Sequence, residues 1–314
     1  MQAIMVSRHG GPETLQPGET QIPEPRRDEV LVRVLAAGVG PWDVAVRTGR
    51  LDAGLPYIPG AEFAGLVVGD SGADAAFEDG EPVYGYPGLT GCYAQYVCCP
   101  AEQMAPLPAG LTVPDAAAVP VDAMTAKQGL TDQLGIAAGD TVLITAAAGG
   151  LGHLAVQIAR VHGANVIATA SQQHHDFVHR LGASLVLDHQ QPDWPQQVRK
   201  LTDGGASKVL ACAEPTLAGA AAAARDGAVL ATPVHADSYP GSDRVHWQSY
   251  NGQARGSDLI ALAPWFDDGS LEVWVSRRFY WKDAAAAHRQ VETGHTQGKL
   301  VLVVDDDLAA RSGV

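Results

Sequence analysis

The chain has 314 residues, of which 46% are hydrophobic, and its formal net charge is −14 at pH 7. This length favours two domains, and the excess of acidic residues argues against a nucleic acid or an anionic membrane surface as partner. No segment approaches the roughly 20 consecutive apolar residues of a membrane helix, and the first residues lack a signal-peptide pattern, so we expect a cytoplasmic protein.

The first 120 residues have the composition of an irregular, mostly β domain. They are rich in Gly and Pro and contain short β-branched runs such as 30–35, which is typical of short strands joined by turns. Residues 1–8 predict a first strand. A helix is predicted to begin at Pro41, because proline is favoured at the first helical position, and to run towards Arg47 until Gly49 ends it.

The cysteines form no recognisable metal or disulfide pattern. No pair has the C-x-x-C spacing, and two are adjacent in sequence, which suits neither an ordinary disulfide nor a zinc knuckle. The four are Cys92, Cys98, Cys99 and Cys212. We therefore predict buried free thiols in a reducing compartment.

After about residue 120 the chain alternates between predicted strands and helices. The apolar run 141–145 is typical of a strand buried on both faces of a parallel sheet. This alternation predicts right-handed βαβ units and a doubly wound α/β fold. A last strand, 298–304, is expected to return to the first domain. The other predicted strands are 165–170, 184–187, 208–213 and 228–231, and the predicted helices are 151–162, 176–181, 194–201 and 217–225.

A glycine-rich loop joins the first strand of this region to its first helix. Residues 146–152 follow the pattern A-x-x-G-x-x-G, a variant of the dinucleotide-binding fingerprint. Glycines permit a tight turn and a close backbone approach to a pyrophosphate, and the helix N-terminus offers free N–H groups to that anion. The predicted cofactor-binding residues here are Ala147, Gly149, Gly150, Leu151 and Gly152.

The end of the second predicted strand favours NADP(H) over NAD(H). NAD enzymes usually place an Asp or Glu about 20 residues beyond the loop, where it holds the ribose 2′-hydroxyl. Here no acid occurs before Asp176. Ser171 can donate a hydrogen bond to a 2′-phosphate, and His174, His175 or Arg180 can supply positive charge. The alternative is that these histidines are exposed residues at the start of a helix.

Several motifs, in the same order along the chain, resemble one known family. They are Gly10-Gly11-Pro12-Glu13, Pro23-Glu24-Pro25, Glu29-Val30-Leu31-Val32-Arg33-Val34, Leu55-Pro56-Tyr57-Ile58-Pro59-Gly60, Arg180-Leu181-Gly182-Ala183 and Gly298-Lys299-Leu300-Val301-Leu302, besides the glycine loop. Over nearly its whole length the chain resembles the zinc-independent quinone oxidoreductase, or zeta-crystallin-like, branch of the medium-chain dehydrogenase/reductase superfamily.

The resemblance implies a fold, an assembly and a reaction. The fold would be α/β, with a GroES-like β domain, residues 1–120 and 270–314, around an inserted Rossmann domain, residues 121–269, and an active site in the cleft between them. The assembly would be a homodimer. The reaction would transfer a hydride from NADPH to a quinone or an α,β-unsaturated carbonyl compound. In the family pattern Thr125 lies near the nicotinamide amide, and His189 replaces a Tyr that contacts the cofactor phosphate.

The zinc-binding positions of related dehydrogenases are not retained. Those enzymes use a Cys early in the first helix and a His-Glu pair after the Pro-Gly turn. The corresponding stretches here begin at Gly40 and at Ala61, and only Glu62 remains. One carboxylate cannot build a three-ligand catalytic site, so we expect no metal.

The chain also departs from the family where substrate would bind. Gly40 and Ala45 replace an Asn and a Tyr, which removes the obvious proton donor for reduction of a C=C bond. Tyr57 and Trp42 remain as candidates for the substrate pocket, although either side chain suits the core as well. Two other functions therefore stay open: a non-redox enzyme such as a cyclase, and a binding protein that senses NADP(H).

Overall fold

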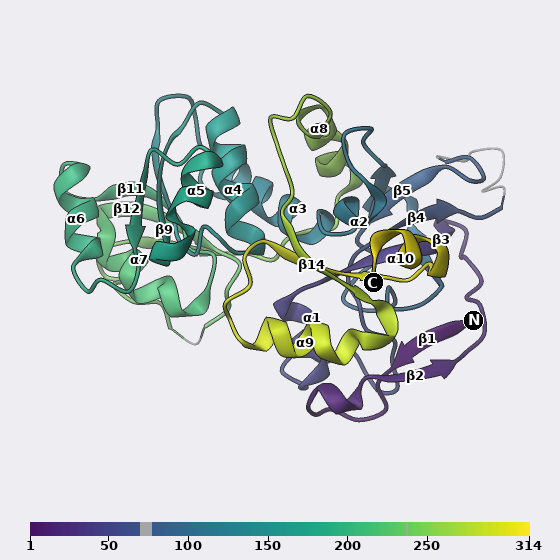
Figure 1. Ribbon diagram of the computed structural model, residues 1–314. Helices are drawn as coiled ribbons and strands as arrows, with labels where there is room; N and C mark the ends of the chain where they lie inside the picture. The colour runs from purple at the N-terminus through teal and green to yellow at the C-terminus, as the bar shows by residue number, and fades with distance from the viewer. Residues whose placement is uncertain (70–76, 237) are drawn as a thin grey trace. The chain divides into compact units, whose positions relative to one another are not determined.

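The computed structural model describes residues 1–69, 77–236 and 238–314, which group into two compact units (Figure 1). The first unit contains 1–121, 254–269 and 273–314. The second contains 122–253 and 270–272. Each unit has its own sheet and its own cluster of buried apolar side chains.

The first unit is mostly β, as its Gly- and Pro-rich sequence predicts, and its strands pair antiparallel except for β14 with β15, which are parallel. Among its described residues, β1 and β2 form a ribbon, and a larger sheet has the order β14-β15-β3-β4-β5-β7, with β6 paired to β3. The strands are β1 (Gln2–Met5), β2 (Gln16–Glu19), β3 (Glu29–Val39), β4 (Phe63–Val67), β5 (Pro82–Gly85), β6 (Tyr96–Pro100), β7 (Met104–Pro106), β14 (Val275–Tyr280) and β15 (Lys299–Val303).

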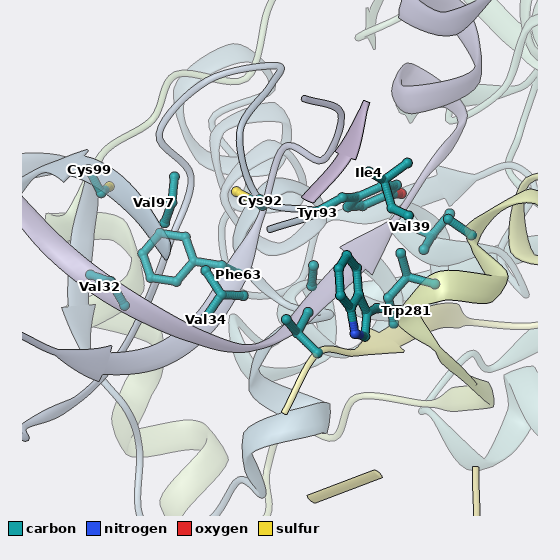
Figure 2. Packing of buried hydrophobic residues seen from close by; sticks show 14 of the residues in the cluster. Ile4, Val32, Val34, Val39, Phe63, Cys92, Tyr93, Val97, Cys99 and Trp281 are labelled. Carbon is teal, nitrogen blue, oxygen red and sulfur yellow. The ribbon is translucent and has the colours of Figure 1, made fainter. Parts of the chain in front are cut away.

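Strand β3 organises this sheet because it pairs with three others. It is antiparallel to β4, β6 and β15, and its burial alternates over its first half before every residue from Ala37 to Val39 becomes buried. Ile4, Val34, Phe63 and Trp281 belong to the apolar cluster that packs around it, as Figure 2 shows. Because β15 pairs with β3, the predicted return of the last strand to the first domain is confirmed.

The helices of the first unit begin and end at recognisable signals. Helix α1 runs from Pro41 to Arg47, as predicted, and Gly49 lies beyond its end with a φ of 81°. Helix α10 is capped by Asp305, whose side chain accepts from the Leu308 N–H group. The helices are α1 (Pro41–Arg47), α2 (Val113–Ala116), α8 (Gly256–Asp267), α9 (Ala284–Glu292) and α10 (Asp306–Ser312).

The second unit is a parallel sheet with the strand order β10-β9-β8-β11-β12-β13. Numbered along the chain, this is 3-2-1-4-5-6, the order of a Rossmann fold. The strands are β8 (Thr141–Ile144), β9 (Asn165–Ala170), β10 (Leu185–Asp188), β11 (Ala206–Leu210), β12 (Ala224–Thr232) and β13 (His246–Ser249). The helices are α3 (Pro120–Gln128), which begins in the first unit, α4 (Gly150–Val161), α5 (His175–Arg180), α6 (Trp194–Leu201) and α7 (Leu217–Ala223).

Two segments group differently from the expected domain boundaries, and the shorter one, residues 270–272, groups with the second unit. Residues 254–269, which contain α8, were expected in the Rossmann domain but group with the first unit. Two long-range hydrogen bonds explain this grouping. The Tyr84 hydroxyl donates to the Leu259 carbonyl oxygen (3.3 Å), and the Gly110 N–H donates to Asp267 Oδ1 (2.9 Å).

The helices of the described chain are short or polar compared with a membrane-spanning helix. In the part of the chain that the structure describes, no helix combines the length and the apolar character required to cross a membrane.

Candidate functional site

The glycine loop forms the turn between β8 and α4. Ala146 has a φ of 50°, and Gly149 is the extended N-cap of the twelve-residue helix α4, whose first turn holds no acidic side chain. A Cβ on Gly152 would lie 2.3 Å from the Ala146 carbonyl oxygen and 2.7 Å from Ala147 Cα. The helix therefore packs against the loop as closely as glycine allows. Backbone N–H groups at this N-terminus suit a pyrophosphate.

The structure brings together Ser171, His175 and His189 at the carboxyl ends of β9 and β10. All three surround Ala170, the last residue of β9. The Ala170 carbonyl oxygen accepts from His175 Nε2 (3.3 Å) and from the His189 backbone N–H (3.4 Å), and Ser171 follows directly in the chain. Ser171, the His175 ring and the backbone of His189 thus meet at the strand end where a Rossmann fold holds the adenosine ribose.

Sequence reasoning missed an acidic neighbour of these histidines, Asp188. It ends β10, and its carboxylate accepts from the Gln190 N–H (3.0 Å). This backbone hydrogen bond lowers the pKa of Asp188, and the nearby His189 and His175 contribute further. The signal for it is positional, because Asp188 is the last residue of the strand next to β9. A carboxylate here offers an acceptor to a ribose hydroxyl and repels a phosphate.

Thr125, the expected neighbour of the nicotinamide, is buried in α3. Its carbonyl oxygen accepts from the Tyr250 hydroxyl (2.9 Å), and a Cβ on Gly252 would lie 2.2 Å from Thr125 Oγ1. Helix α3 is therefore packed against the segment that follows β13. This contact places Thr125 beside the carboxyl end of the sheet's last strand.

In the first unit, Glu62 and Lys299 form a fully buried ion pair. Lys299 Nζ lies 2.7 Å from Glu62 Oε1, and both side chains are at most 2% exposed. Glu62 Oε2 also accepts from the Val121 N–H (2.8 Å). The carboxylate that corresponds to a zinc ligand in related dehydrogenases is thus occupied by a cation of the chain itself.

Gly40 and Trp42, the two unusual residues at the start of α1, are sterically coupled. A Cβ on Gly40 would lie 2.2 Å from Cζ2 of the Trp42 indole, so the indole occupies the volume that a side chain at position 40 would need. Lys299 Nζ lies 4.6 Å from the centroid of the Trp42 ring, which is a cation–π contact. Trp42 therefore packs on the buried ion pair, and this favours its structural role.

Asp43 is a buried carboxyl group whose charge is poorly compensated. Its Oδ2 accepts from the Gly40 N–H (2.8 Å). Among the described residues Oδ1 has no hydrogen bond of normal geometry, although the Tyr93 hydroxyl is near enough to lower the pKa. Burial is the largest effect and raises the pKa of Asp43 to about 7, with the charge of Glu62 acting in the same direction. The carboxyl group thus holds its proton well above the usual range of an Asp.

Tyr57, the other pocket candidate, lies close to Asp43. It is 8% exposed, and its hydroxyl has no hydrogen-bond partner in the described part of the chain. Burial first, and then the charge of Asp43, raise the pKa of Tyr57 to about 12. A packed tyrosine with a capped hydroxyl was the alternative to a substrate contact, and the cap is absent among the residues that the structure describes. The substrate role of Tyr57 remains a prediction.

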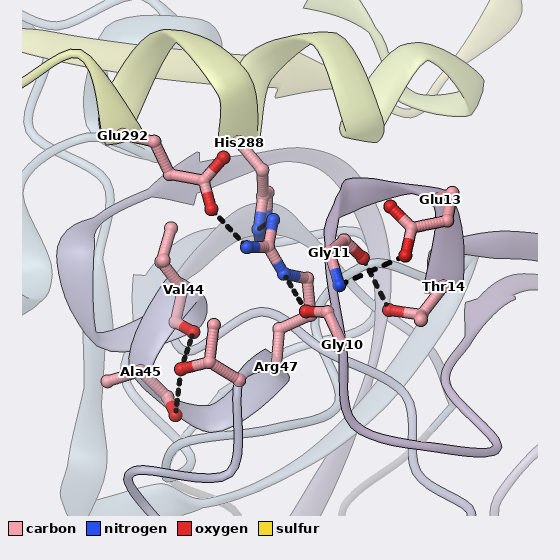
Figure 3. A network of polar contacts seen from close by, with 10 residues as sticks. Gly10, Gly11, Glu13, Thr14, Val44, Ala45, Arg47, His288 and Glu292 are labelled. Carbon is pink, nitrogen blue, oxygen red and sulfur yellow. Dashed lines mark hydrogen bonds and ion pairs between the residues drawn. The ribbon is translucent and has the colours of Figure 1, made fainter.

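Arg47, at the end of α1, ties this helix to α9 (Figure 3). Its guanidinium is buried, pairs with Glu292, donates from Nε to the Gly10 carbonyl oxygen (3.1 Å), and lies 3.4 Å from His288 Nδ1. Burial, followed by the Arg47 charge, lowers the pKa of His288 to about 3, so the ring is neutral. His288 Nε2 lies 3.3 Å from the Tyr93 hydroxyl. These contacts join α1 to α9 and to the segment around Gly10.

The described residues contain no candidate metal site. Over 1–69, 77–236 and 238–314, no three His, Cys, Asp or Glu side chains lie close enough together to hold a metal ion. All four cysteines are free, with Cys92 and Cys99 buried and the other two partly buried. The prediction of free thiols is therefore correct for all four, and the prediction that they are buried is correct for two of them.

Comparisons with known proteins agree with this geometry. A model of the alcohol dehydrogenase GroES-like domain matches residues 26–109, and a model described as zinc-binding dehydrogenase matches residues 181–302. Quinone oxidoreductase of Mus musculus is 33% identical over 203 residues, 63% of this chain. The alignment spans 61% of the length of that relative. A trans-enoyl reductase of Aspergillus terreus is 28% identical over 310 residues, which are 89% of this chain and 87% of that protein.

Solved structures extend the similarity to almost every residue. An NAD-dependent alcohol dehydrogenase superposes with a TM-score of 0.87 and 30% identity, over 97% of this chain and 100% of the other. A mycobacterial protein in complex with NADPH superposes with a TM-score of 0.85 and 29% identity, over the same shares of the two chains. Both the antiparallel unit and the Rossmann unit therefore have counterparts of known structure.

Proposed function

The chain belongs to the medium-chain dehydrogenase/reductase superfamily, in its quinone oxidoreductase branch, and we propose that it is a zinc-independent NADPH-dependent reductase of quinones or α,β-unsaturated carbonyl compounds. The observation that carries this proposal is the 3-2-1-4-5-6 sheet with the glycine loop at the carboxyl end of its first strand. The names of two relatives, a quinone oxidoreductase and a trans-enoyl reductase, support the acceptor class.

The cofactor would be held by the glycine loop and the start of α4 in the Rossmann unit. The N-terminus of α4, with Ala147, Gly149, Gly150, Leu151 and Gly152, fits the pyrophosphate. When bound, NADPH supplies a hydride to an electrophilic carbon of the acceptor. The protein would contribute binding, orientation of the reacting carbons and one proton for each turnover.

The absence of zinc in this proposal rests on Glu62. Its two carboxylate oxygens bind Lys299 and the Val121 N–H. Gly40 and Ala61 offer no ligand at the other two positions. We also propose a homodimer, because β13 is an edge strand of the sheet and pairs with β12 alone among the described strands.

The test of the proposed function is turnover with a panel of quinones and enones. We expect acceptor-dependent loss of NADPH absorbance by protein that has been treated with a chelator, and tighter binding of NADPH than of NADH. Tight NADPH binding without turnover on any acceptor would contradict the reductase proposal and favour a sensor. Failure to bind either nucleotide would remove the cofactor from the proposal altogether.

Cofactor preference is expected to depend on Ser171 and His175. A charge-assisted hydrogen bond contributes about 1.5–3 kcal/mol, so Ser171→Ala or His175→Gln should weaken NADPH binding by roughly tenfold or more and leave NADH binding within about twofold. Titration of both nucleotides by fluorescence measures this preference.

His246→Gln is the matched control for these variants. His246 is an exposed histidine at the amino end of β13. Because the strands are parallel, it lies at the opposite end of the sheet from the carboxyl ends of β9 and β10. Equal loss of NADPH and NADH affinity in the Ser171 and His175 variants would show that neither residue contacts a 2′-phosphate. The carboxylate of Asp188 would then be the better candidate for a ribose contact.

A further inference from the structure

Three polar side chains of the second unit form a hydrogen-bonded cluster for which the sequence showed no motif. His235 Nε2 lies 2.7 Å from Asn251 Oδ1, and His235 Nδ1 lies 3.1 Å from Ser249 Oγ. Both ring nitrogens are therefore occupied, and all three side chains are exposed. An imidazole between a hydroxyl and an amide oxygen can pass a proton to the hydroxyl while the amide fixes its orientation.

The cluster lies at the carboxyl ends of the parallel strands, which is where this fold binds ligands. His235 follows β12, Ser249 is the last residue of β13, and Asn251 comes two residues later. Because β12 and β13 are parallel, with Thr232 paired to Ser249, all three residues lie beyond the carboxyl ends of their strands. These strands belong to the second half of the 3-2-1-4-5-6 sheet, whereas the glycine loop and Ser171 belong to the first half. A dinucleotide extends across both halves.

The backbone around the cluster is held in place by its neighbours. Tyr250, which lies between Ser249 and Asn251, donates its hydroxyl to the Thr125 carbonyl oxygen (2.9 Å), and its N–H donates to the Thr232 carbonyl oxygen (3.1 Å). The Val234 N–H donates to Thr232 Oγ1 (3.1 Å), which anchors the start of the His235 loop. These hydrogen bonds hold the backbone of the His235 loop and of the segment after β13 close together, which suits proton transfer between their side chains.

We propose that Ser249, His235 and Asn251 form a proton relay at the carboxyl end of β12 and β13, which delivers the proton consumed by the reduction. This inference rests on the proposed reductase function. It supplies the proton source that Gly40 and Ala45 do not offer. Ser249 is the catalytic residue of the relay, because its hydroxyl hands the proton to the substrate, and His235 and Asn251 are positioning residues that act through it.

The step balances for an α,β-unsaturated carbonyl substrate. The β-carbon gains a C–H bond by accepting the hydride and its electron pair from NADPH, which is oxidised to NADP⁺. The C=C π electrons move towards the carbonyl group, and the α-carbon then takes a proton from Ser249 Oγ. The hydroxyl recovers a proton from Nδ1 of the His235 imidazolium, while Nε2–H remains hydrogen-bonded to Asn251 Oδ1. The resulting neutral imidazole takes up one H⁺ from solvent before the next turnover, which is the proton that the overall reduction consumes.

Few other titratable groups face this imidazole among the described residues. Its hydrogen-bond partners, Ser249 and Asn251, are uncharged over the working pH range. Tyr239, on the same loop, donates its hydroxyl to the Val234 carbonyl oxygen (2.8 Å) and stacks on Trp247. Asp237 lies outside the described residues.

The first experiment compares turnover of His235→Gln, Ser249→Ala and the control His246→Gln. Loss of a positioned acid lowers the rate by about 10²–10⁴-fold, so we expect kcat to fall by about 100-fold or more in the first two variants and to stay within about twofold in the control. NADPH affinity should change by less than about threefold in all of them. Imidazole added to the buffer should partly restore turnover of His235→Ala, which a purely structural histidine would not permit.

The second experiment needs no turnover. In two-dimensional NMR spectra of the histidine rings, NADP⁺ is expected to shift the His235 resonances and to leave those of His246 unchanged. Turnover of His235→Gln within about threefold of wild type, or equal losses of kcat and of NADPH affinity, would overturn the relay. An unperturbed His235 ring in the presence of saturating NADP⁺ would overturn it as well. If the wild-type protein turns over no acceptor, the reductase proposal fails and the relay with it.

Discussion

Replacing Lys299 by Met is expected to lower the free energy of unfolding by on the order of 3–5 kcal/mol, because it leaves a carboxylate buried without its cation. Glu62 is fully buried, and Lys299 Nζ lies 2.7 Å from its Oε1. Lys299 also contacts the Trp42 ring. Chemical denaturation monitored by tryptophan fluorescence measures the change.

Two variants make this result specific to the buried pair. Lys208 pairs with Asp140 at 2.6 Å, but both side chains are more than a fifth exposed, so Lys208→Met should cost no more than about 1 kcal/mol. The double variant Lys299→Met/Glu62→Gln removes both charges and should recover a large part of the stability. A cost for Lys299→Met as small as that of Lys208→Met would show that the buried charge is compensated elsewhere.

The Asp43→Asn variant is expected to be more stable than the wild type at neutral and alkaline pH. The pKa of Asp43 rises from 3.8 to about 7 in the folded protein, so between these values the folded state holds a proton that the unfolded state has released. Stability from this group is therefore complete below about pH 4 and is lost as the pH rises through 7. The loss is on the order of 4 kcal/mol. An uncharged Asn avoids it and can still accept from the Gly40 N–H.

The measurement is the difference in unfolding free energy between Asp43→Asn and the wild type across this pH range. The two proteins should be similar near about pH 4, where the wild-type carboxyl is protonated, and should diverge in favour of Asn towards about pH 8. A difference that does not vary with pH would show that Asp43 is ionised in the folded protein. Asp188→Asn is a suitable control, because its pKa is lowered and its side chain is near the surface.

The elements that sequence predicted best are those with local signals. Helix α1 begins at a proline and stops before a glycine, and its predicted and observed bounds are the same. Strand β9 also has its predicted bounds, because a β-branched run ends there at the start of a helical pattern. Strand β11 was predicted at 208–213 and is found at Ala206–Leu210. The apolar run continues beyond its end, so composition did not mark where pairing stops.

The parts that sequence missed depend on contacts between distant residues. Helix α8 is joined to Tyr84 and Gly110, and no periodicity within residues 254–269 reveals this packing. The Glu62–Lys299 pair joins a residue that precedes the inserted unit in the sequence to a residue that follows it. Strand β13 was not predicted, because its sequence, His-Trp-Gln-Ser, is largely polar and exposed. Without that strand, the nearness of Ser249 to His235 is invisible in the sequence.

The candidate cofactor residues show the same difference between local sequence signals and contacts of distant residues. The glycine loop is a continuous motif, so its position before a helix was predictable. The arrangement of Ser171, His175 and His189 around one carbonyl group follows from the pairing of β9 with β10. Asp188 belongs to that arrangement but is distant from the loop in sequence, and it was overlooked for this reason.

The pairing of β15 with β3 has a consequence for synthesis on the ribosome. Strand β3 lies in the first part of the chain, yet its antiparallel neighbour β15 is translated after the whole Rossmann unit. At roughly 5–20 residues per second, the wait between β7 and β15 is on the order of 10–40 s. The inserted unit can fold during this interval, while the end of β3 from Ala36 to Val39 stays open on one side to other nascent strands. The surrounding unit, although its sequence comes first, is completed last.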